Sequence, residues 1–151
     1  MAPHALSEAI QDYLKGIYKL QQAGGHTTVT ALARDQGVSA ASASAMIKKL
    51  AVLGLLEHEP YRGARLTPAG ERVALEVIRH HRLLELYLAE TLGVAVDDVH
   101  AEADRLEHVI SEELEERIDR ALGHPTHDPH GDPIPDANLN WPAASRSIRV
   151  K

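Results

Sequence analysis

The chain contains no cysteine among its 151 residues. This absence excludes disulfides, thiolate metal sites and cysteine nucleophiles, and it fits a reducing cytoplasm. Any bound metal must therefore be held by nitrogen and oxygen atoms. No apolar run approaches the roughly 20 residues needed to span a membrane, and the N-terminus lacks the pattern of a secretory signal peptide. We therefore expect a soluble, cytoplasmic protein with no membrane partner.

The net charge of -6 is unevenly distributed along the chain. Residues 1–72 carry eight Lys/Arg against six Asp/Glu, residues 73–140 carry five against sixteen, and residues 141–151 carry three against none. Binding to nucleic acid depends on neutralising phosphates, so only the first segment suits that task. The polarity predicts two domains with separate roles, 1–72 and 73–140, followed by a tail, 141–151.

Three helices are predicted in the first segment. Apolar residues recur at helical spacing over residues 5–22, and two glycines follow. Thr28 can cap a short second helix that Gly37 ends, and the third helix covers about residues 39–53. The turn between these two helices is only residues 37–39, which is typical of a helix-turn-helix. On the third helix we expect the following side chains to face the core: Ala45, Ile47, Leu50 and Leu53.

A hairpin and two longer helices are predicted after this unit. Residues 55–59 and 64–67 have the pattern of two strands around a turn at 60–63, which would form a wing. Pro68 can open a helix that runs to about Leu92. A last long helix is predicted over about residues 101–122, with an apolar stripe repeating every four residues: Leu106, Ile110, Leu114, Ile118 and Leu122.

Carboxylates and imidazoles in the acidic half have the spacing of metal ligands. Asp104, Glu107 and His108 stand at i, i+3 and i+4, so one helix face would bring their oxygen and nitrogen atoms together. Such ligands suit manganese, iron(II), cobalt or zinc, and a high share of carboxylates favours manganese. A second set on neighbouring helices repeats the pattern: His81, Glu85 and His100. Each set alone is more often a solvated acidic face.

Several segments together resemble the diphtheria toxin repressor and manganese transport regulator family of metal-dependent repressors. They are Asp12-Tyr13-Leu14-Lys15-Gly16-Ile17-Tyr18, Tyr61-Arg62-Gly63, Leu66-Thr67-Pro68-Ala69-Gly70, His81-Arg82-Leu83-Leu84-Glu85, Val99-His100, Glu107-His108-Val109-Ile110-Ser111 and His130-Gly131-Asp132-Pro133-Ile134-Pro135. The resemblance implies a mostly α fold, with an N-terminal winged helix-turn-helix followed by an α-helical metal-binding and dimerisation domain. Longer members append an SH3-like domain, for which this chain is too short.

The resemblance also implies two metal sites. The primary, activating site would comprise Asp12, Asp104, Glu107 and His108, and the ancillary site would comprise His81, Glu85 and His100. Iron-responsive members carry methionine and cysteine at the positions of Asp12 and Asp104. The two carboxylates therefore favour manganese(II) over iron(II), with zinc, cobalt and cadmium as surrogates. Lys15 stands where binuclear manganese regulators carry a further acid, so we expect separate sites rather than a bridged pair.

The implied function is repression of metal-transport genes, with manganese transport as the natural target, rather than enzyme activity. A metal held by Asp12 and by ligands of the acidic half would stabilise the DNA-competent state. We expect a homodimer that binds palindromic double-stranded promoter DNA, with the stripe from Leu106 to Leu122, Leu83, Leu84 and Tyr87 as the dimer and domain core. The expected DNA-contacting residues are Ser39, Ala40, Ala41, Ser42, Ser44, Lys48, Lys49 and Arg62.

Two rival functions are compatible with parts of this pattern. A metal-independent winged-helix regulator of an organic ligand would share the fold, although no organic cofactor is expected here. A small metallohydrolase could activate water at a metal, but the chain has no His-Glu-x-x-His pattern and no Gly-rich phosphate loop. The histidine-rich loop could hold a third metal with Asp128 and Asp132, although we expect a structural connector: His124, His127 and His130.

Overall fold

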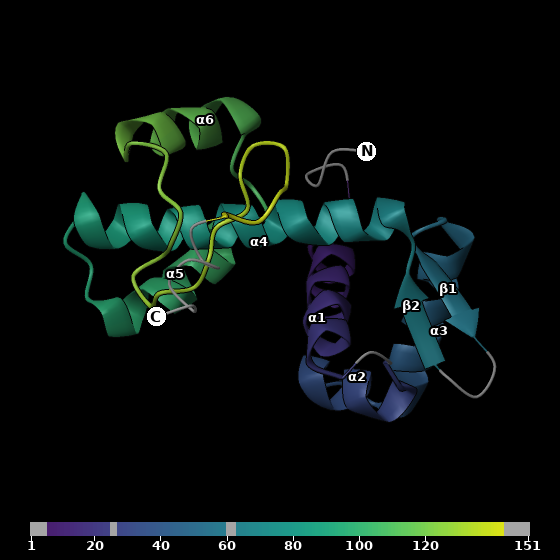
Figure 1. Cartoon of the computed structure of the whole chain (residues 1–151). Helices are drawn as coiled ribbons and strands as arrows, with labels where there is room; N and C mark the ends of the chain where they lie inside the picture. Colours follow the sequence, from purple (N-terminus) through teal and green to yellow (C-terminus); the bar gives the residue numbers. More distant parts are fainter. Residues whose placement is uncertain (1–5, 25–26, 60–62, 144–151) are drawn as a thin grey trace. The chain divides into compact units, whose positions relative to one another are not determined.

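The computed structural model describes residues 6–24, 27–59 and 63–143, and it divides into two units, Met1–Ala74 and Leu75–Lys151. Each unit is mostly helical, which confirms the predicted fold class (Figure 1). The first unit contains α1 (Glu8–Gly24), α2 (Val29–Gln36), α3 (Ala40–Val52), β1 (Leu56–Glu59), β2 (Gly63–Leu66) and the start of α4 (Pro68–Glu90). The second contains the rest of α4, α5 (Val96–Leu106) and α6 (Glu112–Ala121).

Side-chain caps define the helix-turn-helix in the first unit. The Thr28 hydroxyl accepts a hydrogen bond from the backbone N–H of Ala31, and the Ser39 hydroxyl accepts one from Ser42 N–H, both at 3.1 Å. Gly37 ends α2 with φ of 67°, a left-handed conformation that glycine adopts without strain. These contacts confirm the predicted short turn between α2 and α3.

The buried face of α3 differs from the predicted one. Ala43, Ile47 and Leu50 are buried, whereas Ala45 is exposed and Leu53 remains 40% exposed. Residues 43, 47 and 50 lie on one helix face, and Ala45 lies about 200° around the helix from Ala43. Leu53 is the C-cap of α3 and lies beyond its last turn. The prediction was therefore wrong for Ala45 and Leu53.

The predicted hairpin is present, and its strands pair with Leu56 opposite Leu66 and Glu59 opposite Gly63. Leu56 and Leu66 are buried, and Glu57 is exposed. Gly63 has φ of 88°, and a Cβ there would lie 2.2 Å from the carbonyl oxygen of Thr27. That carbonyl accepts the N–H of Ala64 at 2.8 Å, so Gly63 permits the segment before α2 to pack against the hairpin.

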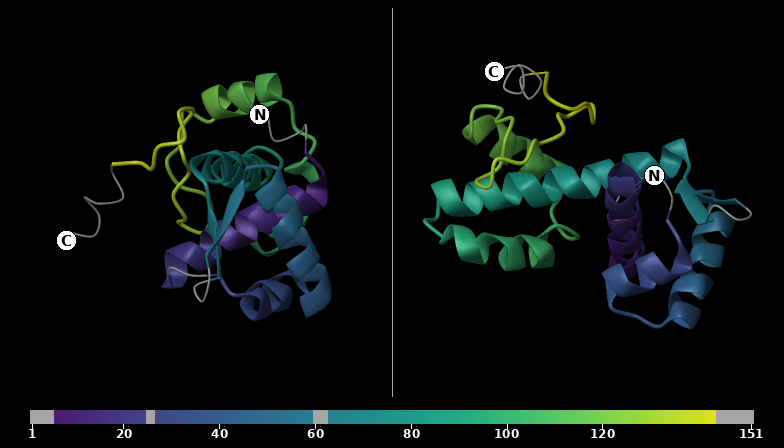
Figure 2. Two further views of the ribbon diagram at one scale, coloured as in Figure 1. Left: turned by 90° about the vertical axis from the view of Figure 1, so that its right-hand side faces the viewer. Right: turned by 60° about the horizontal axis from the view of Figure 1, so that its bottom comes forward.

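In the second unit, α5 and α6 lie on opposite sides of α4 (Figure 1, Figure 2). The single helix predicted over residues 101–122 is wrong, because α5 ends at Leu106 and α6 begins at Glu112. Ser111 is the N-cap of α6, and its hydroxyl accepts the N–H of Leu114 at 3.1 Å. A serine that caps a new helix offers the backbone an alternative to continuing the previous one.

The break between α5 and α6 also divides the predicted apolar stripe. Ile110 and Ile118 are each 5% exposed, whereas Leu106 is 38% and Leu114 is 49% exposed. The buried members form the core of this unit with side chains from α4, α5 and the C-terminal loop: Leu83, Leu84, Ala103, Ile110, Ile118 and Ile134. Leu83 and Leu84 are thus part of the core within one chain. No helix within the described ranges is long and apolar enough to cross a membrane.

The C-terminal loop is anchored to α4 by two arginines. Arg82 donates a hydrogen bond to the carbonyl of Pro133 at 2.7 Å, and Arg79 donates one to the carbonyl of Pro135 at 2.8 Å. Ile134 between these carbonyls is 1% exposed. The loop is irregular, as expected from its proline and glycine content, and it supplies part of the core of the second unit.

Candidate metal centre

Four predicted ligands converge between α4 and α5. His81 and Glu85 are one turn apart on α4, and the atoms His81 Nε2 and Glu85 Oε2 are 3.2 Å apart. His100 on α5 places Nδ1 at 3.1 Å from His81 Nε2 and at 3.4 Å from Glu85 Oε2. Asp104 follows one turn further along α5. Its Oδ2 lies 3.3 Å from His100 Nε2, and its Oδ1 lies 3.4 Å from His81 Nδ1. The predicted ancillary set is therefore adjacent to Asp104.

Glu107 and His108 join this group from the backbone that follows α5. The side chain of Glu107 is fully buried, and its Oε1 atom lies 2.5 Å from His81 Nδ1. Its other oxygen, Oε2, is 3.4 Å from His108 Nε2, and the side chain of His108 is 3% exposed. Glu107 is the C-cap of α5, so these two ligands do not lie on a continuous helix face as predicted. Tertiary packing brings them to His81 instead.

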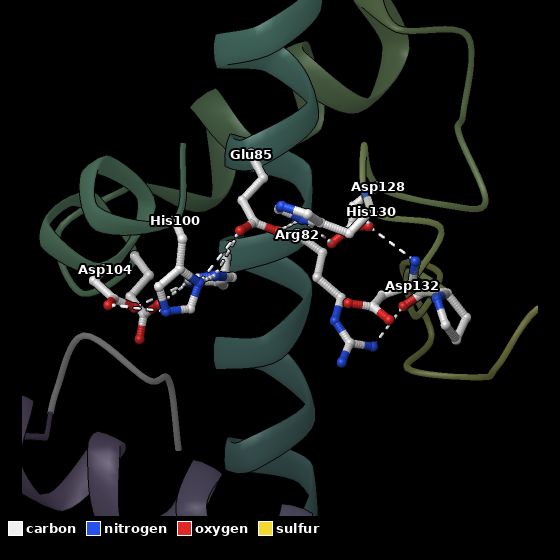
Figure 3. A network of polar contacts seen from close by, with 10 residues as sticks. Arg82, Glu85, His100, Asp104, Asp128, His130 and Asp132 are labelled. Atoms are coloured by element: carbon white, nitrogen blue, oxygen red, sulfur yellow. Dashed lines mark hydrogen bonds and ion pairs between the residues drawn. The ribbon is translucent and has the colours of Figure 1, made fainter. Parts of the chain in front are cut away.

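The C-terminal loop supplies further candidate ligands. Figure 3 shows Glu85 with His100 and Asp104 on one side and with Asp128 and His130 on the other. His130 Nδ1 is 3.7 Å from Glu85 Oε1 and 3.9 Å from Asp128 Oδ2. Asp128 Oδ1 accepts the N–H groups of His130 and Asp132, each at 2.9 Å, which closes the turn of the loop. Its Oδ2 atom is buried without a hydrogen-bond partner.

The pKa shifts of Glu85 and Asp128 are compatible with a bound cation between the two carboxyl groups. Burial acts to raise the pKa of Glu85, but the hydrogen bond with His81 and the neighbouring Asp128 carboxyl outweigh burial and lower this pKa to about 2. Burial, followed by the contact with Glu85, raises the pKa of Asp128 to about 6. Two buried carboxylates side by side repel unless a proton or a cation lies between them. The buried Asp128 Oδ2 has no hydrogen-bond partner while its carboxyl is ionised, and when protonated it can donate to Glu85. The neighbouring oxygen and nitrogen atoms suit a divalent metal ion in place of that proton.

Two clusters of the second unit have the compactness of a metal site. In one, ligand atoms of His81, His100 and Asp104 all lie within 4.8 Å of one another, and in the other the same holds for Glu85, Asp128 and His130. Glu85 contacts both clusters, since its Oε2 lies near His81 and its Oε1 near His130. The arrangement can thus offer several alternative sets of three or more ligands to an ion.

A buried polar network lies behind these ligands. Glu115 of α6 is bound by two consecutive residues of α4, with Arg79 Nε at 2.8 Å from its Oε2 and His80 Nε2 at 3.3 Å from its Oε1. His80 Nδ1 lies 3.2 Å from the carbonyl oxygen of Glu107. Burial acts to lower the pKa of His80, but the hydrogen bond and charge of Glu115 and the Glu107 carbonyl outweigh burial, so this pKa is raised.

The expected DNA-contacting residues of α3 lie largely on its exposed side. Lys48 and Lys49 are exposed, and Ser44 is half-buried. The Ser39 hydroxyl is engaged in capping α3, which leaves less of its hydrogen-bonding capacity for DNA. The remaining predicted positions of this helix are exposed as well: Ala40, Ala41 and Ser42.

Two further predicted site residues, Asp12 and Arg62, belong to the first unit but not to α3. Asp12 lies on α1, and its carbonyl accepts a hydrogen bond from the Gln36 side chain at 3.3 Å. Its part in a metal site stays a prediction. Arg62, expected to reach DNA from the wing, lies outside the residues that the structure describes.

The role of the C-terminal loop and the network around His80 were not predicted from the sequence. The loop was expected to be a connector rather than a third metal site, whereas Asp128 and His130 lie next to Glu85. The loop folds back on α4 from more than forty residues along the chain, and no spacing rule predicts that contact. The other two loop histidines have different partners. His124 Nδ1 lies 3.0 Å from Asp119 Oδ2, and His127 Nδ1 lies 2.9 Å from Thr126 Oγ1.

Comparison with known proteins gives matches over both halves of the chain. Residues 5–64 match the family described as "Iron dependent repressor, N-terminal DNA binding domain", and residues 67–136 match "Iron dependent repressor, metal binding and dimerisation domain". The iron-dependent repressor IdeR of Mycobacterium bovis is 36% identical over 130 residues, which cover 86% of this chain and 56% of that protein. An uncharacterized HTH-type transcriptional regulator of Methanocaldococcus jannaschii is 33% identical over 75% of this chain and 91% of its own length.

Solved structures give the same result. A manganese-dependent transcriptional repressor in complex with manganese superposes with a TM-score of 0.79 at 46% identity, covering 89% of this chain and 62% of that one. The chain therefore spans little more than half the length of several relatives that it matches. The matches to both domains establish that the chain belongs to the iron-dependent repressor family of metal-dependent transcriptional repressors.

Proposed function

We propose that this protein represses manganese-transport genes, and that it binds palindromic promoter DNA as a homodimer when manganese(II) occupies its metal sites. The proposed primary site comprises Asp12, Asp104, Glu107 and His108. The proposed ancillary site comprises His81, Glu85 and His100, extended by Asp128 and His130 of the C-terminal loop. Asp12 is included because of its position in the sequence motif.

The observation that carries the proposal is the convergence of carboxylates and imidazoles around His81. Asp104, Glu107, Glu85 and His100 each place an oxygen or nitrogen atom within 3.4 Å of a ring nitrogen of His81. Three of these groups are carboxylates, and Glu85 and Glu107 are almost fully buried. A divalent ion would supply positive charge that offsets their repulsion, and its binding energy would stabilise the state that holds these ligands together.

The ligand types support manganese over softer metals. None of the proposed ligands offers sulfur, and carboxylate oxygen suits manganese(II) and iron(II). Zinc and cobalt are expected to bind such a site more tightly than manganese in vitro, because affinity rises along the first-row series. The choice of metal in the cell then depends on availability as well as affinity.

The proposed DNA-binding surface is the exposed side of α3, with Lys48 and Lys49 as phosphate contacts. Small side chains at the start of a recognition helix permit close approach to the base edges of the major groove: Ser39, Ala40, Ala41, Ser42 and Ser44. Arg62 in the wing is proposed to contact the backbone or the minor groove.

The first test is binding of the purified chain to the DNA upstream of its own gene at fixed salt, with chelator and then with manganese(II), iron(II) or zinc(II). We expect micromolar manganese to raise the affinity at least about tenfold, or roughly 1.4 kcal/mol of coupling. Equal binding with chelator would contradict the proposal and favour a regulator of an organic ligand. Turnover of esters or phosphates would instead favour a metallohydrolase.

A matched pair of variants on α5 localises the effect. Asp104→Ala should abolish the metal-dependent increase in DNA affinity, because Asp104 is a proposed ligand. Asp98→Ala removes the same charge from an exposed position in the first turn of α5, and it should leave the increase intact. Tight, metal-dependent binding by the Asp104 variant would remove Asp104 from the site.

A further inference from the structure

The network behind the metal ligands has one feature that packing alone does not require. Two neighbouring histidines of α4 contact the same residue, Glu107, at different atoms. His80 Nδ1 lies 3.2 Å from the Glu107 carbonyl oxygen, and His81 Nδ1 lies 2.5 Å from the Glu107 carboxylate. Glu107 therefore has both its backbone and its side chain held by α4.

The local backbone explains why such a hold is needed. Glu107 is the C-cap of α5, and residues 107–111 between α5 and α6 are not helical. Carbonyl groups in the last turn of a helix have no partner within that helix. The Glu107 carbonyl is buried, and it obtains its partner from the His80 ring. The Glu107 N–H is held within α5, where it donates to the Ala103 carbonyl at 2.8 Å, and the His80 contact adds a second anchor on the carbonyl side of the same residue.

Glu115, held by Arg79, fixes the other side of the His80 ring. The other ring nitrogen lies 3.3 Å from Glu115 Oε1, and Arg79 binds the second oxygen of Glu115 at 2.8 Å. Both facing atoms are oxygens, so the protonated, cationic ring can donate a hydrogen bond to each of them, whereas the neutral ring can donate to one at a time. The His80 side chain is 3% exposed, so bulk solvent has little access to either contact.

We propose that His80, oriented by Glu115 and Arg79, is a positioning residue that sets the location of the Glu107 carboxylate for metal binding. This inference rests on the proposed function, since it takes Glu107 as a ligand. Residues that orient metal ligands typically contribute 10–100-fold to metal affinity, so affinity should fall about tenfold when the His80 hydrogen bond to Glu107 is removed.

The test compares two variants of His80 in the whole chain. Asparagine places an amide donor near the position of Nδ1, which keeps the hydrogen bond to the Glu107 carbonyl. Glutamine places its donor near Nε2, which keeps the hydrogen bond to Glu115 and removes the one to Glu107. Manganese(II) affinity is measured by competition with a fluorescent chelator, and the thermal midpoint is measured with excess chelator. We expect His80→Asn to bind within about threefold of the wild type and His80→Gln to bind at least about tenfold more weakly.

A role in packing alone predicts the opposite order, because glutamine fills the space of histidine better than asparagine does. Equal affinities of the two variants, or weaker binding by His80→Asn, would therefore overturn the proposal. Glu115→Gln should also weaken manganese binding, whereas Glu116→Gln, with a side chain 76% exposed on the same helix, should not.

Glu107→Gln separates this inference from the proposed function. If Glu107→Gln binds manganese weakly while both His80 variants bind like the wild type, only the positioning role fails. If Glu107→Gln itself binds like the wild type, Glu107 is not a ligand, and the proposed site and the positioning role fail together.

Discussion

Replacing Asp128 by asparagine should stabilise the metal-free protein. The two oxygens of Asp128 have different surroundings, since Oδ1 accepts the N–H groups of His130 and Asp132, while Oδ2 is buried without a hydrogen-bond partner near Glu85. Asparagine retains the accepting oxygen and places an NH₂ group at the position of Oδ2. The turn is therefore preserved, and a repulsive pair of carboxyls becomes a carboxylate beside a donor.

The pKa of Asp128 sets the size and sign of this effect. The change from 3.8 to about 6 corresponds to about two pKa units, or about 3 kcal/mol as an upper limit at about 1.4 kcal/mol per unit. We expect a gain of about 1–3 kcal/mol in the free energy of unfolding at pH 7.5. Above about pH 6 the folded protein holds Asp128 ionised next to Glu85, so the full loss of folding stability caused by the raised pKa is present. As the pH falls below about 6 the folded state takes up a proton, and near 3.8 this loss disappears.

Urea denaturation with chelator, at pH 7.5 and again near pH 4, measures this gain. Asp132→Asn is the control, because it removes the same charge from an exposed position of the same loop. It should change the free energy of unfolding by less than about 0.5 kcal/mol. With manganese at 100 times its Kd the wild type should gain about 2.7 kcal/mol, and the Asp128 variant should gain less because it lacks a proposed ligand. A variant no more stable than the wild type at pH 7.5, or a gain that persists at pH 4, would refute the reasoning.

Three further substitutions test other parts of the structure. Gly63→Ala should destabilise the first unit by at least about 2 kcal/mol in urea denaturation, because its Cβ would collide with the Thr27 carbonyl at positive φ; an unchanged midpoint would contradict the hairpin packing. Ser111→Ala removes the cap of α6 and should cost about 1 kcal/mol, which lowers the thermal midpoint by about 2–4 °C; no decrease would show that the cap is not needed. Alanine at both Lys48 and Lys49 should reduce the slope of log affinity for DNA against log salt by about 0.9 for each phosphate that is no longer neutralised; the same slope would exclude both lysines from binding phosphates.

Local signals predicted the first unit well. Thr28, Ser39 and Gly37 each perform the capping role that their residue type favours, so helix ends were readable from single positions. The hairpin followed from two short strand patterns around a turn. The inward face of α3 was less predictable, because alanine gives a weak signal for burial, and Ala43 rather than Ala45 faces the core.

The second unit shows where local signals fail. The repeat from Leu106 to Leu122 is consistent with one helix, and only the position of Ser111 could have indicated a break. The predicted set of His81, Glu85 and His100 was found together because i, i+4 spacing on α4 and one contact with α5 are sufficient to bring it together. Asp128 and His80 contact residues far along the chain, Glu85 and Glu107, and such contacts are set by packing rather than by spacing.

The break after α5 has a consequence for how the site can be formed. Because residues 107–111 lie outside both helices and keep only a few backbone hydrogen bonds to α5, the positions of Glu107 and His108 depend also on His80, His81 and the burial of Ile110. A peptide covering residues 96–121 would then not reproduce the ligand geometry, even if made helical by an alcohol co-solvent. Within this segment the N–H groups of Glu107 and Ile110 belong to buried residues and donate to the carbonyls of Ala103 and Leu106, so these two amide protons should exchange with solvent only when the second unit opens, and their exchange would report its stability.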